Sequence, residues 1–171
     1  MAVIVNWVRQ QNKAEYCDEV LLFDEKFKIY YVDNIIIKTE WCIEQSNDFL
    51  DKSNQWQHLQ HYLNNPVENI TISLMKQGSD FRNKVWAEMC KIPAGQTMTY
   101  SKLAKQINSG ARAVANACRD NPFPGIIPCH RVVAVSGLGG YMGKTSGRAL
   151  EIKDKLLNQE AMIRANMEAK N

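Results

Sequence analysis

Near residue 77 the sequence changes from strand-like to helix-like patterns, and this change limits the folds that the chain can adopt. Residues 18–41 consist of short apolar and β-branched runs separated by Asp24-Glu25 and Asp33-Asn34, a pattern typical of antiparallel strands joined by tight turns. Beyond this point apolar residues recur at helical spacing. We therefore expect an α/β (α+β) protein with a small strand-rich domain at residues 1–77 and a mainly helical domain at residues 78–171.

The net charge divides the chain at the same place. Residues 1–77 carry seven lysines and arginines against eleven acidic residues, whereas residues 78–171 carry fourteen against seven. An anionic partner would therefore bind the second half. A basic surface alone does not separate a nucleic-acid partner from an ordinary solvated face, so the partner must be inferred from motifs.

The first residues and the cysteines bear on the compartment. Residues 1–8 are too short a stretch for a spanning helix and lack the layout of a signal peptide, so we expect an intracellular protein without a membrane partner, cytoplasmic in a prokaryote and nuclear in a eukaryote. The cysteines are odd in number and include no Cys-x-x-Cys pair, which favours free thiols over disulfides or a zinc site. They are Cys17, Cys42, Cys90, Cys118 and Cys129.

A polar helix is expected at residues 55–63, ended by Asn64-Asn65-Pro66. His58 and His61 lie three positions apart in it, so both could face one side and hold a metal. No third ligand is evident nearby, and we interpret them as partly exposed histidines of a polar helix.

Three helices are expected at the start of the basic half. A core helix should begin after the N-cap Ser79, with an apolar face formed by Phe81, Val85, Trp86 and Met89. Two shorter helices at residues 100–107 and 111–120 flank the turn at residues 108–110. A pair of short helices around a glycine-containing turn resembles a helix-turn-helix.

The second helix of this pair is rich in alanine, with Arg112 near its start and Arg119 near its end. Small side chains allow a helix to approach another surface closely. Alanine is also the best helix former, so the composition favours a DNA-contacting helix only modestly over a packed one. The alanines are Ala111, Ala113, Ala115 and Ala117.

Cys129 and His130 stand side by side between two apolar runs, directly after Pro128. An isolated Cys-His pair is usually structural. The thiolate is nevertheless the reactive form of cysteine, and a neighbouring base makes it available at neutral pH. The pair is therefore a candidate nucleophile and base.

The segment Ile127-Pro128-Cys129-His130-Arg131-Val132 resembles the active-site signature of the O6-alkylguanine-DNA alkyltransferase family. Further family motifs follow in the family's order over about residues 78–160, whereas the N-terminal segment is similar only in size and strand-rich pattern. These motifs are Phe81-x3-Val85-Trp86, Ile92-Pro93-x-Gly95-x-Thr97-x-Thr99-Tyr100, Leu103-Ala104, Ala111-Arg112-Ala113-Val114, Asn121-Pro122 and Gly140-Tyr141. The resemblance implies a ribonuclease H-like N-terminal domain at residues 1–77 and a DNA-binding, alkyl-transferring domain at residues 78–171.

The resemblance also implies a mechanism, which is direct repair of O6-alkylguanine by irreversible transfer of the alkyl group to Cys129. Tyr100 would donate its hydroxyl proton to N3 of the departing guanine, and His130 would take the thiol proton through a water molecule. Glu160 would orient His130, and Asn121 would hold the turn before the nucleophile. The chemistry requires no cofactor and no metal.

The implied partner is double-stranded DNA, contacted through the minor groove by a monomeric protein. Arg112 would enter the gap left by the extruded base. The other implied DNA contacts are Ala111, Ala113, Arg119, Tyr100, Lys102 and Lys105. The implied substrate pocket consists of Pro128, Val132, Tyr141, Met142 and Gly143.

Departures from the family pattern leave alternatives open. The turn between Leu103 and Arg112 is shorter than usual, and residues 143–148 form an extended stretch at the pocket rim, where they would widen or narrow the range of alkyl groups accepted. Cys118, on the second helix of the pair, is interpreted as buried and inert. Residues 161–171 are expected to form a loose end.

Two other functions are compatible with parts of the pattern. One is a non-catalytic sensor of alkylated DNA, but family members without transfer activity replace the cysteine, whereas Cys129 is present here. The other is a thiol hydrolase using Cys129 and His130, which would need an oxyanion site that the sequence does not announce.

Overall fold

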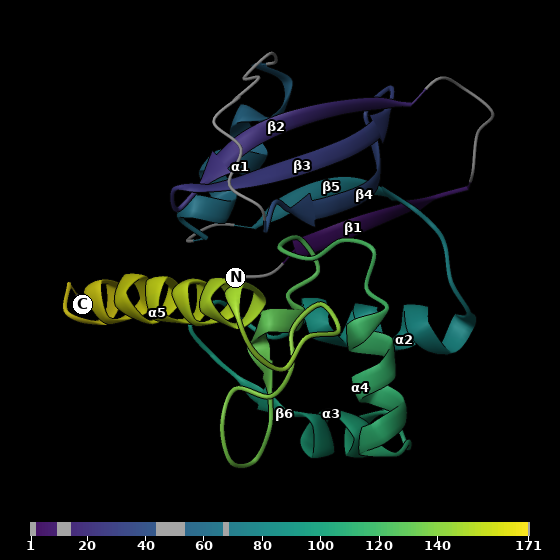
Figure 1. Cartoon of the computed structure of the whole chain (residues 1–171), viewed down its shortest axis with the longest axis vertical. Coiled ribbons are helices and arrows are strands. Elements are labelled where there is room, and N and C mark those ends of the chain that lie inside the picture. Colours follow the sequence, from purple (N-terminus) through teal and green to yellow (C-terminus); the bar gives the residue numbers. More distant parts are fainter. Residues whose placement is uncertain (1–2, 10–14, 44–53, 67–68, 171) are drawn as a thin grey trace.

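A computed structural model describes residues 3–9, 15–43, 54–66 and 69–170. Its N-terminal part is a five-stranded sheet in the order β1-β5-β4-β3-β2 (Figure 1). The strands β2, β3 and β4 are antiparallel neighbours, while β1 and β4 both run parallel to β5. Their bounds are β1 Val3–Val8, β2 Tyr16–Leu22, β3 Glu25–Val32, β4 Ile35–Trp41 and β5 Ile70–Met75.

The expected strand meander is confirmed, with one shift at its first turn. Phe23 belongs to that turn and not to the strand run in which its apolar character placed it. Phe23 and Asp24 both have positive φ values, 54° and 63°. Two consecutive left-handed residues form the turn type whose twist matches that of the flanking strands, so Leu22 and Glu25 can pair across it.

Helix α1 (Gln57–Asn64) follows a 3₁₀ turn at Asn54–Trp56 and packs against β2. Leu59 and Tyr62 are its buried residues. His58 and His61 are exposed. Among the residues that the structure describes, no group of three or more histidine, cysteine, aspartate or glutamate side chains could hold a metal ion.

The C-terminal part contains four helices and a two-stranded sheet. Ser79 caps the first helix as expected, because its Oγ accepts a hydrogen bond from the Arg82 amide at 3.3 Å. Phe81 was expected on the buried face but is 38% exposed, since it lies in the first turn, outside the stripe formed by Val85, Trp86 and Met89. The elements are α2 Asp80–Cys90, β6 Met98–Thr99, α3 Tyr100–Gln106, α4 Ala111–Arg119, β7 Val132–Val133 and α5 Arg148–Glu168.

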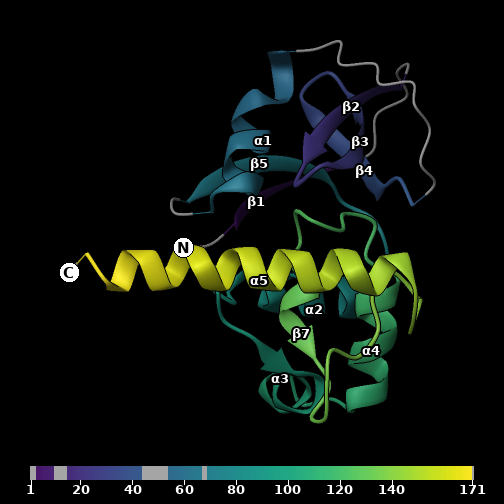
Figure 2. The same cartoon turned by 60° about the vertical axis from the view of Figure 1, so that its left-hand side comes forward.

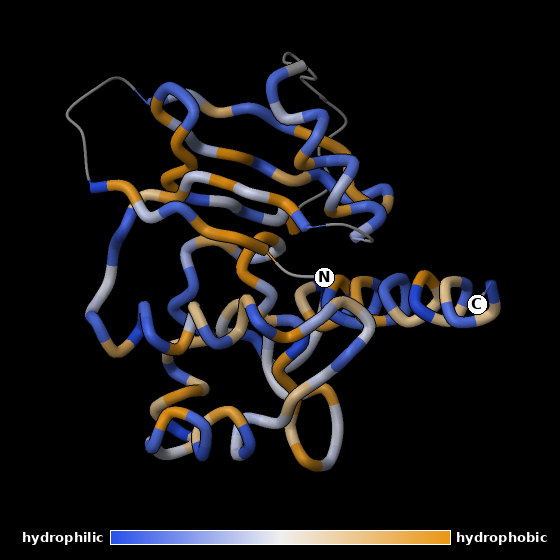
Figure 3. The backbone as a smooth tube through the Cα atoms, turned by 180° about the vertical axis from the view of Figure 1, so that it is seen from behind, coloured by the Kyte–Doolittle hydropathy of each residue, from blue (hydrophilic) through white to orange (hydrophobic). Residues whose placement is uncertain are grey.

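Helix α5 lies between the five-stranded sheet and helices α2 to α4, and its C-terminal end projects beyond them (Figure 2). The expectation of a loose end at residues 161–171 is wrong for most of that segment, because α5 is helical as far as Glu168. Its last turns are exposed and mixed in hydropathy, whereas apolar stretches are frequent in the sheet strands (Figure 3). None of the described helices combines the length and apolar character that crossing a membrane requires.

The sheet and the helical part share one continuous apolar core. Strand β4 contacts the segment that precedes the cysteine motif: the Thr39 amide donates to the Pro122 carbonyl, and Thr39 Oγ1 donates to the Pro124 carbonyl, both at 2.9 Å. Gly125 packs against Phe27 and Trp41, where a side chain would be too close to their rings. The sheet therefore supports the chain directly before Cys129.

Candidate active site

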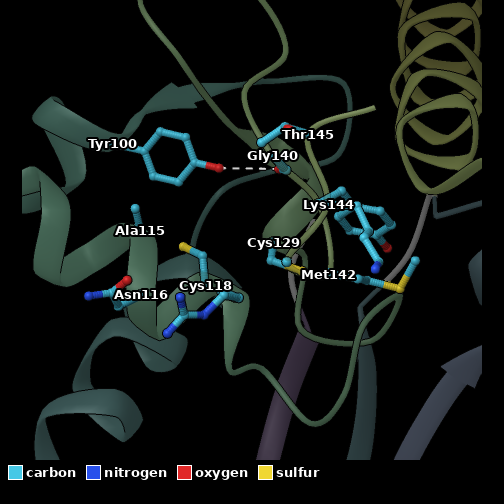
Figure 4. A pocket seen from close by; sticks show the side chains of 12 residues that line it. Tyr100, Ala115, Asn116, Cys118, Cys129, Gly140, Met142, Lys144 and Thr145 are labelled. Carbon is cyan, nitrogen blue, oxygen red and sulfur yellow. Dashed lines mark hydrogen bonds between the residues drawn. The ribbon is translucent and has the colours of Figure 1, made fainter. Parts of the chain in front are cut away.

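Cys129 begins a 3₁₀ turn, Cys129–Arg131, that leads into β7. It is 4% exposed and lines a pocket of about 320 Å³. Figure 4 shows Cys129 between Tyr100 and Met142. The pocket is lined by Tyr100, Ala115, Asn116, Cys118, Arg119, Cys129, Gly140, Tyr141, Met142, Gly143, Lys144 and Thr145.

Asn121 links the nucleophile to the turn that precedes it. Its Nδ2 donates to the Ile127 carbonyl at 3.0 Å and to Cys129 Sγ at 3.2 Å, while its Oδ1 accepts from the Phe123 amide at 3.0 Å. Burial raises the pKa of Cys129, and the hydrogen bond from Asn121 and the charge of Lys153 partly offset this effect. The thiol therefore needs a proton acceptor before it can react.

His130 and Arg131 share one buried carboxylate. His130 Nε2 lies 3.0 Å from Glu160 Oε1, and Arg131 donates from Nη2 to the same oxygen at 2.7 Å and from Nε to both oxygens. The Gly95 amide donates to Glu160 Oε2 at 3.1 Å. Burial raises the pKa of Glu160, but His130 and Arg131 outweigh it and hold that pKa well below its usual range.

The same contacts define the state of His130. Burial lowers its pKa and outweighs the opposing effect of Glu160, so the ring is neutral. A neutral ring that donates Nε2–H to Glu160 keeps a lone pair on Nδ1. His130 Nδ1 is buried and has no hydrogen-bond partner among the described residues, which leaves it free to accept a proton.

Tyr100 lies at the start of α3, and its hydroxyl donates to the Gly140 carbonyl at 3.3 Å (Figure 4). Burial and the two nearby thiols, Cys118 and Cys129, raise the pKa of Tyr100 to about 12. Tyr100 therefore carries its proton at neutral pH and can donate it inside the pocket.

Lys153 is a buried side chain of α5 that the sequence reading did not select. Its Nζ donates to the carbonyls of Val132 and Leu138 at 2.7 Å and of Gly140 at 2.9 Å. Burial lowers the pKa of Lys153 to about 8, against the opposing effect of Cys129 and Cys118. The available signal was a lysine within the apolar register of a helix, next to Ile152.

The remaining pocket residues fall into two groups. Tyr141, Met142 and Gly143 line the pocket as expected. Pro128 and Val132 were expected there but are not among the residues that line it; both are buried, and the Val132 carbonyl accepts a hydrogen bond from Lys153.

Helix α4 forms another side of the pocket. Arg112 and Arg119 are exposed, and Ala111 and Ala113 are partly buried. Lys102 and Lys105 are exposed on the neighbouring helix α3. The pocket lining includes four residues of α4 that were not expected there: Ala115, Asn116, Cys118 and Arg119, the last of which was expected only as a DNA contact.

Cys118 is buried, and its Sγ lies 3.5 Å from Met89 Sδ. Burial and the neighbouring Cys129 raise its pKa far above that of an ordinary thiol. Of the two thiols in the pocket, Cys129 is the one followed directly in the chain by a histidine whose Nδ1 has no partner among the described residues. A reactive thiol beside a helix-turn-helix is the combination expected of a thiol-dependent enzyme that acts on nucleic acid.

Comparisons with known proteins agree with this class. Residues 80–162 match the 6-O-methylguanine DNA methyltransferase, DNA binding domain family. The methylated-DNA–protein-cysteine methyltransferase of Methanosarcina mazei is 39% identical over 127 residues, which cover 72% of this chain and 75% of that protein. Its counterpart from Sulfolobus acidocaldarius is 36% identical over 140 residues, covering 75% and 85%.

Solved structures show the same fold. The crystal structure of Mycobacterium tuberculosis O6-methylguanine methyltransferase has a TM-score of 0.70 at 25% identity, covering 87% of this chain and 94% of that one. A structure from the same organism in complex with DNA has a TM-score of 0.71 at 25% identity, covering 86% and 93%. The chain therefore belongs to the family of methylated-DNA–protein-cysteine methyltransferases, DNA-repair enzymes that transfer an alkyl group to a cysteine of their own.

Proposed function

We propose that this chain repairs O6-alkylguanine in double-stranded DNA by transferring the alkyl group to Cys129 in a single irreversible turnover. The observation that carries the proposal is a buried thiol and a protonated tyrosine that line one pocket, with a neutral histidine directly after the thiol in the chain whose Nδ1 has no partner among the described residues. Family membership supplies the substrate class.

The first step is removal of the thiol proton. Cys129 Sγ gives its proton, through one water molecule, to Nδ1 of His130. The resulting imidazolium is stabilised by Glu160, whose carboxylate is ionised because Arg131 and His130 hold its pKa low. Asn121 Nδ2 and the Lys153 ammonium stabilise the negative charge left on sulfur.

The second step is displacement at the alkyl carbon. The thiolate attacks in line, so that the carbon–sulfur bond forms while the carbon–oxygen bond to O6 breaks. The electron pair of the broken bond moves onto the guanine ring, and the Tyr100 hydroxyl protonates N3. The phenolate regains a proton from the imidazolium through solvent. Because the product is a thioether with no group to hydrolyse it, each protein molecule reacts once.

Helices α3 and α4 are proposed to enter the minor groove of the duplex. Arg112 is exposed and forms no ion pair with a described residue, so it is available to replace the extruded guanine in the base stack. Arg119, Lys102 and Lys105 would contact phosphates, and Ala111 and Ala113 would allow close approach. We further propose that the protein acts as a monomer inside the cell, where its substrate DNA is located.

The test is incubation with a duplex that contains one O6-methylguanine, followed by mass analysis of both protein and DNA. We expect one added methyl group on the Cys129 peptide per protein molecule and unmodified guanine in the strand. The matched variant Cys129→Ala should bind the duplex and transfer nothing. Binding without transfer by the unmodified protein would identify a sensor of alkylated DNA and reject the proposal.

A further inference from the structure

Residues 141–147, called the rim loop here, begin with a tight turn, and the first five of them line the pocket. Tyr141 and Lys144 exchange two backbone hydrogen bonds of 2.9 Å across it. Met142 and Gly143 both have positive φ values, 48° and 75°. Gly143 packs against Arg119 of α4, where a Cβ atom would lie 3.2 Å from Arg119 Cγ. The turn is therefore closed by its own hydrogen bonds, and displacing it moves the whole wall.

The start of the rim loop is held by the N-terminal sheet. Trp41, at the end of β4, donates from Nε1 to the Tyr141 hydroxyl at 3.0 Å. Both side chains are almost completely buried, at 2% and 3% exposure. A buried hydrogen bond of this kind is costly to break, since water cannot replace it.

The end of the rim loop is held by the same sheet. Arg148 directly follows the loop as the first residue of α5, and its Nη2 donates to Glu25 Oε2 at 2.6 Å. Glu25 begins β3, is 5% exposed, and also accepts from Lys155 Nζ at 2.6 Å. A buried carboxylate paired with two cations holds Arg148 more firmly than an exposed ion pair would.

We infer that Trp41 and Glu25 of the N-terminal sheet determine how large an alkyl group the pocket accepts, because they hold the two ends of the rim loop. The inference rests on the proposed function, in which this pocket receives an alkylated guanine. A methyl group enters without moving the loop. A larger group requires outward displacement of residues 142–145, which the two contacts resist.

Trp41 can be tested with a matched control elsewhere in the same sheet domain. Trp41→Phe removes the indole donor and keeps an aromatic ring beside Phe27, whose ring centroid lies 4.7 Å from that of Trp41. The control is Trp56→Phe. Trp56 is also buried, at 6%, and its indole donates to Asp18 at 3.1 Å without touching the rim loop. Each variant loses a buried indole N–H donor, to a hydroxyl at Trp41 and to a carboxylate at Trp56, and only Trp41→Phe releases the rim loop.

Glu25 has a control on α5. Glu25→Gln keeps the size of the side chain but removes the charge that pairs with Arg148. Lys155→Gln removes the second cation and leaves the contact between Glu25 and Arg148 in place. A general weakening of the charge cluster would affect both variants, whereas release of the rim loop affects only Glu25→Gln.

The experiment measures transfer rates from one duplex sequence carrying either O6-methylguanine or O6-benzylguanine. Any effect of a variant on DNA binding cancels in the ratio of the benzyl rate to the methyl rate, called the benzyl-to-methyl ratio. We expect Trp41→Phe and Glu25→Gln each to raise this ratio about tenfold, the change that loss of one buried polar contact produces. The controls should change it by less than about twofold. Amide hydrogen exchange of residues 142–147 should accelerate in the same two variants only.

Each outcome decides between the claims. If the unmodified protein transfers methyl but the ratio is unchanged in both variants, the inference is overturned and the proposed function stands. If the unmodified protein transfers neither a methyl nor a benzyl group, the proposed function and the inference are both rejected. If Trp41→Phe does not fold, as shown by the absence of a cooperative unfolding transition, Tyr141→Phe is used in its place. Tyr141→Phe removes the acceptor of the same hydrogen bond and must produce the same change in the benzyl-to-methyl ratio.

Discussion

The two walls of the pocket are built differently. The nucleophile wall, which comprises residues 121–131 together with Glu160, is organised mainly by side chains of the C-terminal region. The sheet reaches it through Thr39 at the backbone of Pro122 and Pro124 and through ring packing at Phe123 and Gly125. The rim loop is held at both ends by side chains of the N-terminal sheet. The reactive groups and the contacts proposed to select the alkyl group therefore depend mainly on different side chains.

The largest effect is expected from Glu160→Gln, which tests whether the nucleophile wall depends on its buried charge pair. The amide can still accept from His130 but leaves the buried Arg131 guanidinium without a counter-charge. Removing one partner of a buried pair typically costs about 3–5 kcal/mol. Urea unfolding should show this loss, and transfer should be nearly abolished because the imidazolium is no longer stabilised.

The control for this variant lies on the same helix. Glu151 pairs with Arg148, and its side chain is 60% exposed. Glu151→Gln should therefore change the free energy of unfolding by less than about 1 kcal/mol. A stability loss for Glu160→Gln as small as that of Glu151→Gln would contradict the view that this wall depends on a buried charge pair.

Lys153 joins residues that adjoin the two walls, Val132 directly after the nucleophile wall and Gly140 directly before the rim loop, and its replacement should give the next largest effect. Lys153→Met removes the donor from the carbonyls of Val132, Leu138 and Gly140. We expect methyl transfer to slow by about a hundredfold, equivalent to about 2.7 kcal/mol of barrier. Lys155→Met, on the same helix but 45% exposed at its side chain, is the matched control. Equal rates in the two variants would show that Lys153 does not position the pocket.

The same division explains what the sequence could predict. The meander, the helix after Ser79 and the helix pair were predicted because turn pairs and apolar periodicity are local signals. Strands β1 and β5 were not, since their parallel pairing joins segments far apart in the chain. The extent of α5 was also underestimated, because its exposed last turns have no apolar stripe to mark them as helical.

For the site, short motifs led to Cys129 and Tyr100, which line one pocket, and to His130, which directly follows Cys129 and contacts Glu160. Pro128 and Val132 were assigned to the pocket wall by the family resemblance, but they are not among the residues that line the pocket. Lys153, Trp41 and Glu25 were missed for a common reason. Each acts through a partner distant in the sequence, so no local pattern identifies it.

A smaller effect is expected where the sheet touches the nucleophile wall. Thr39→Val keeps the shape of a side chain that is 1% exposed but removes the hydrogen bond to the Pro124 carbonyl. The unpaired carbonyl should lower the free energy of unfolding by about 1–2 kcal/mol. The benzyl-to-methyl ratio should not change, because the rim loop is untouched. A change in that ratio comparable to the one in Trp41→Phe would show that the walls are not independent.

The smallest effect concerns the pH dependence that Lys153 gives to stability. Its pKa is about 8 in the folded protein and 10.5 as an ordinary lysine, so between these values the unfolded chain holds a proton that the folded chain lacks. The contribution of Lys153 to the free energy of unfolding therefore becomes more favourable to the folded state as pH rises, by about 1 kcal/mol between about pH 7 and pH 8.7. Urea unfolding of the unmodified protein and of Lys153→Met at the two pH values isolates this contribution as the difference between their slopes. If the two slopes are equal, the three carbonyls compensate fully for burial of the Lys153 ammonium group. The buried charge would then not destabilise the folded protein.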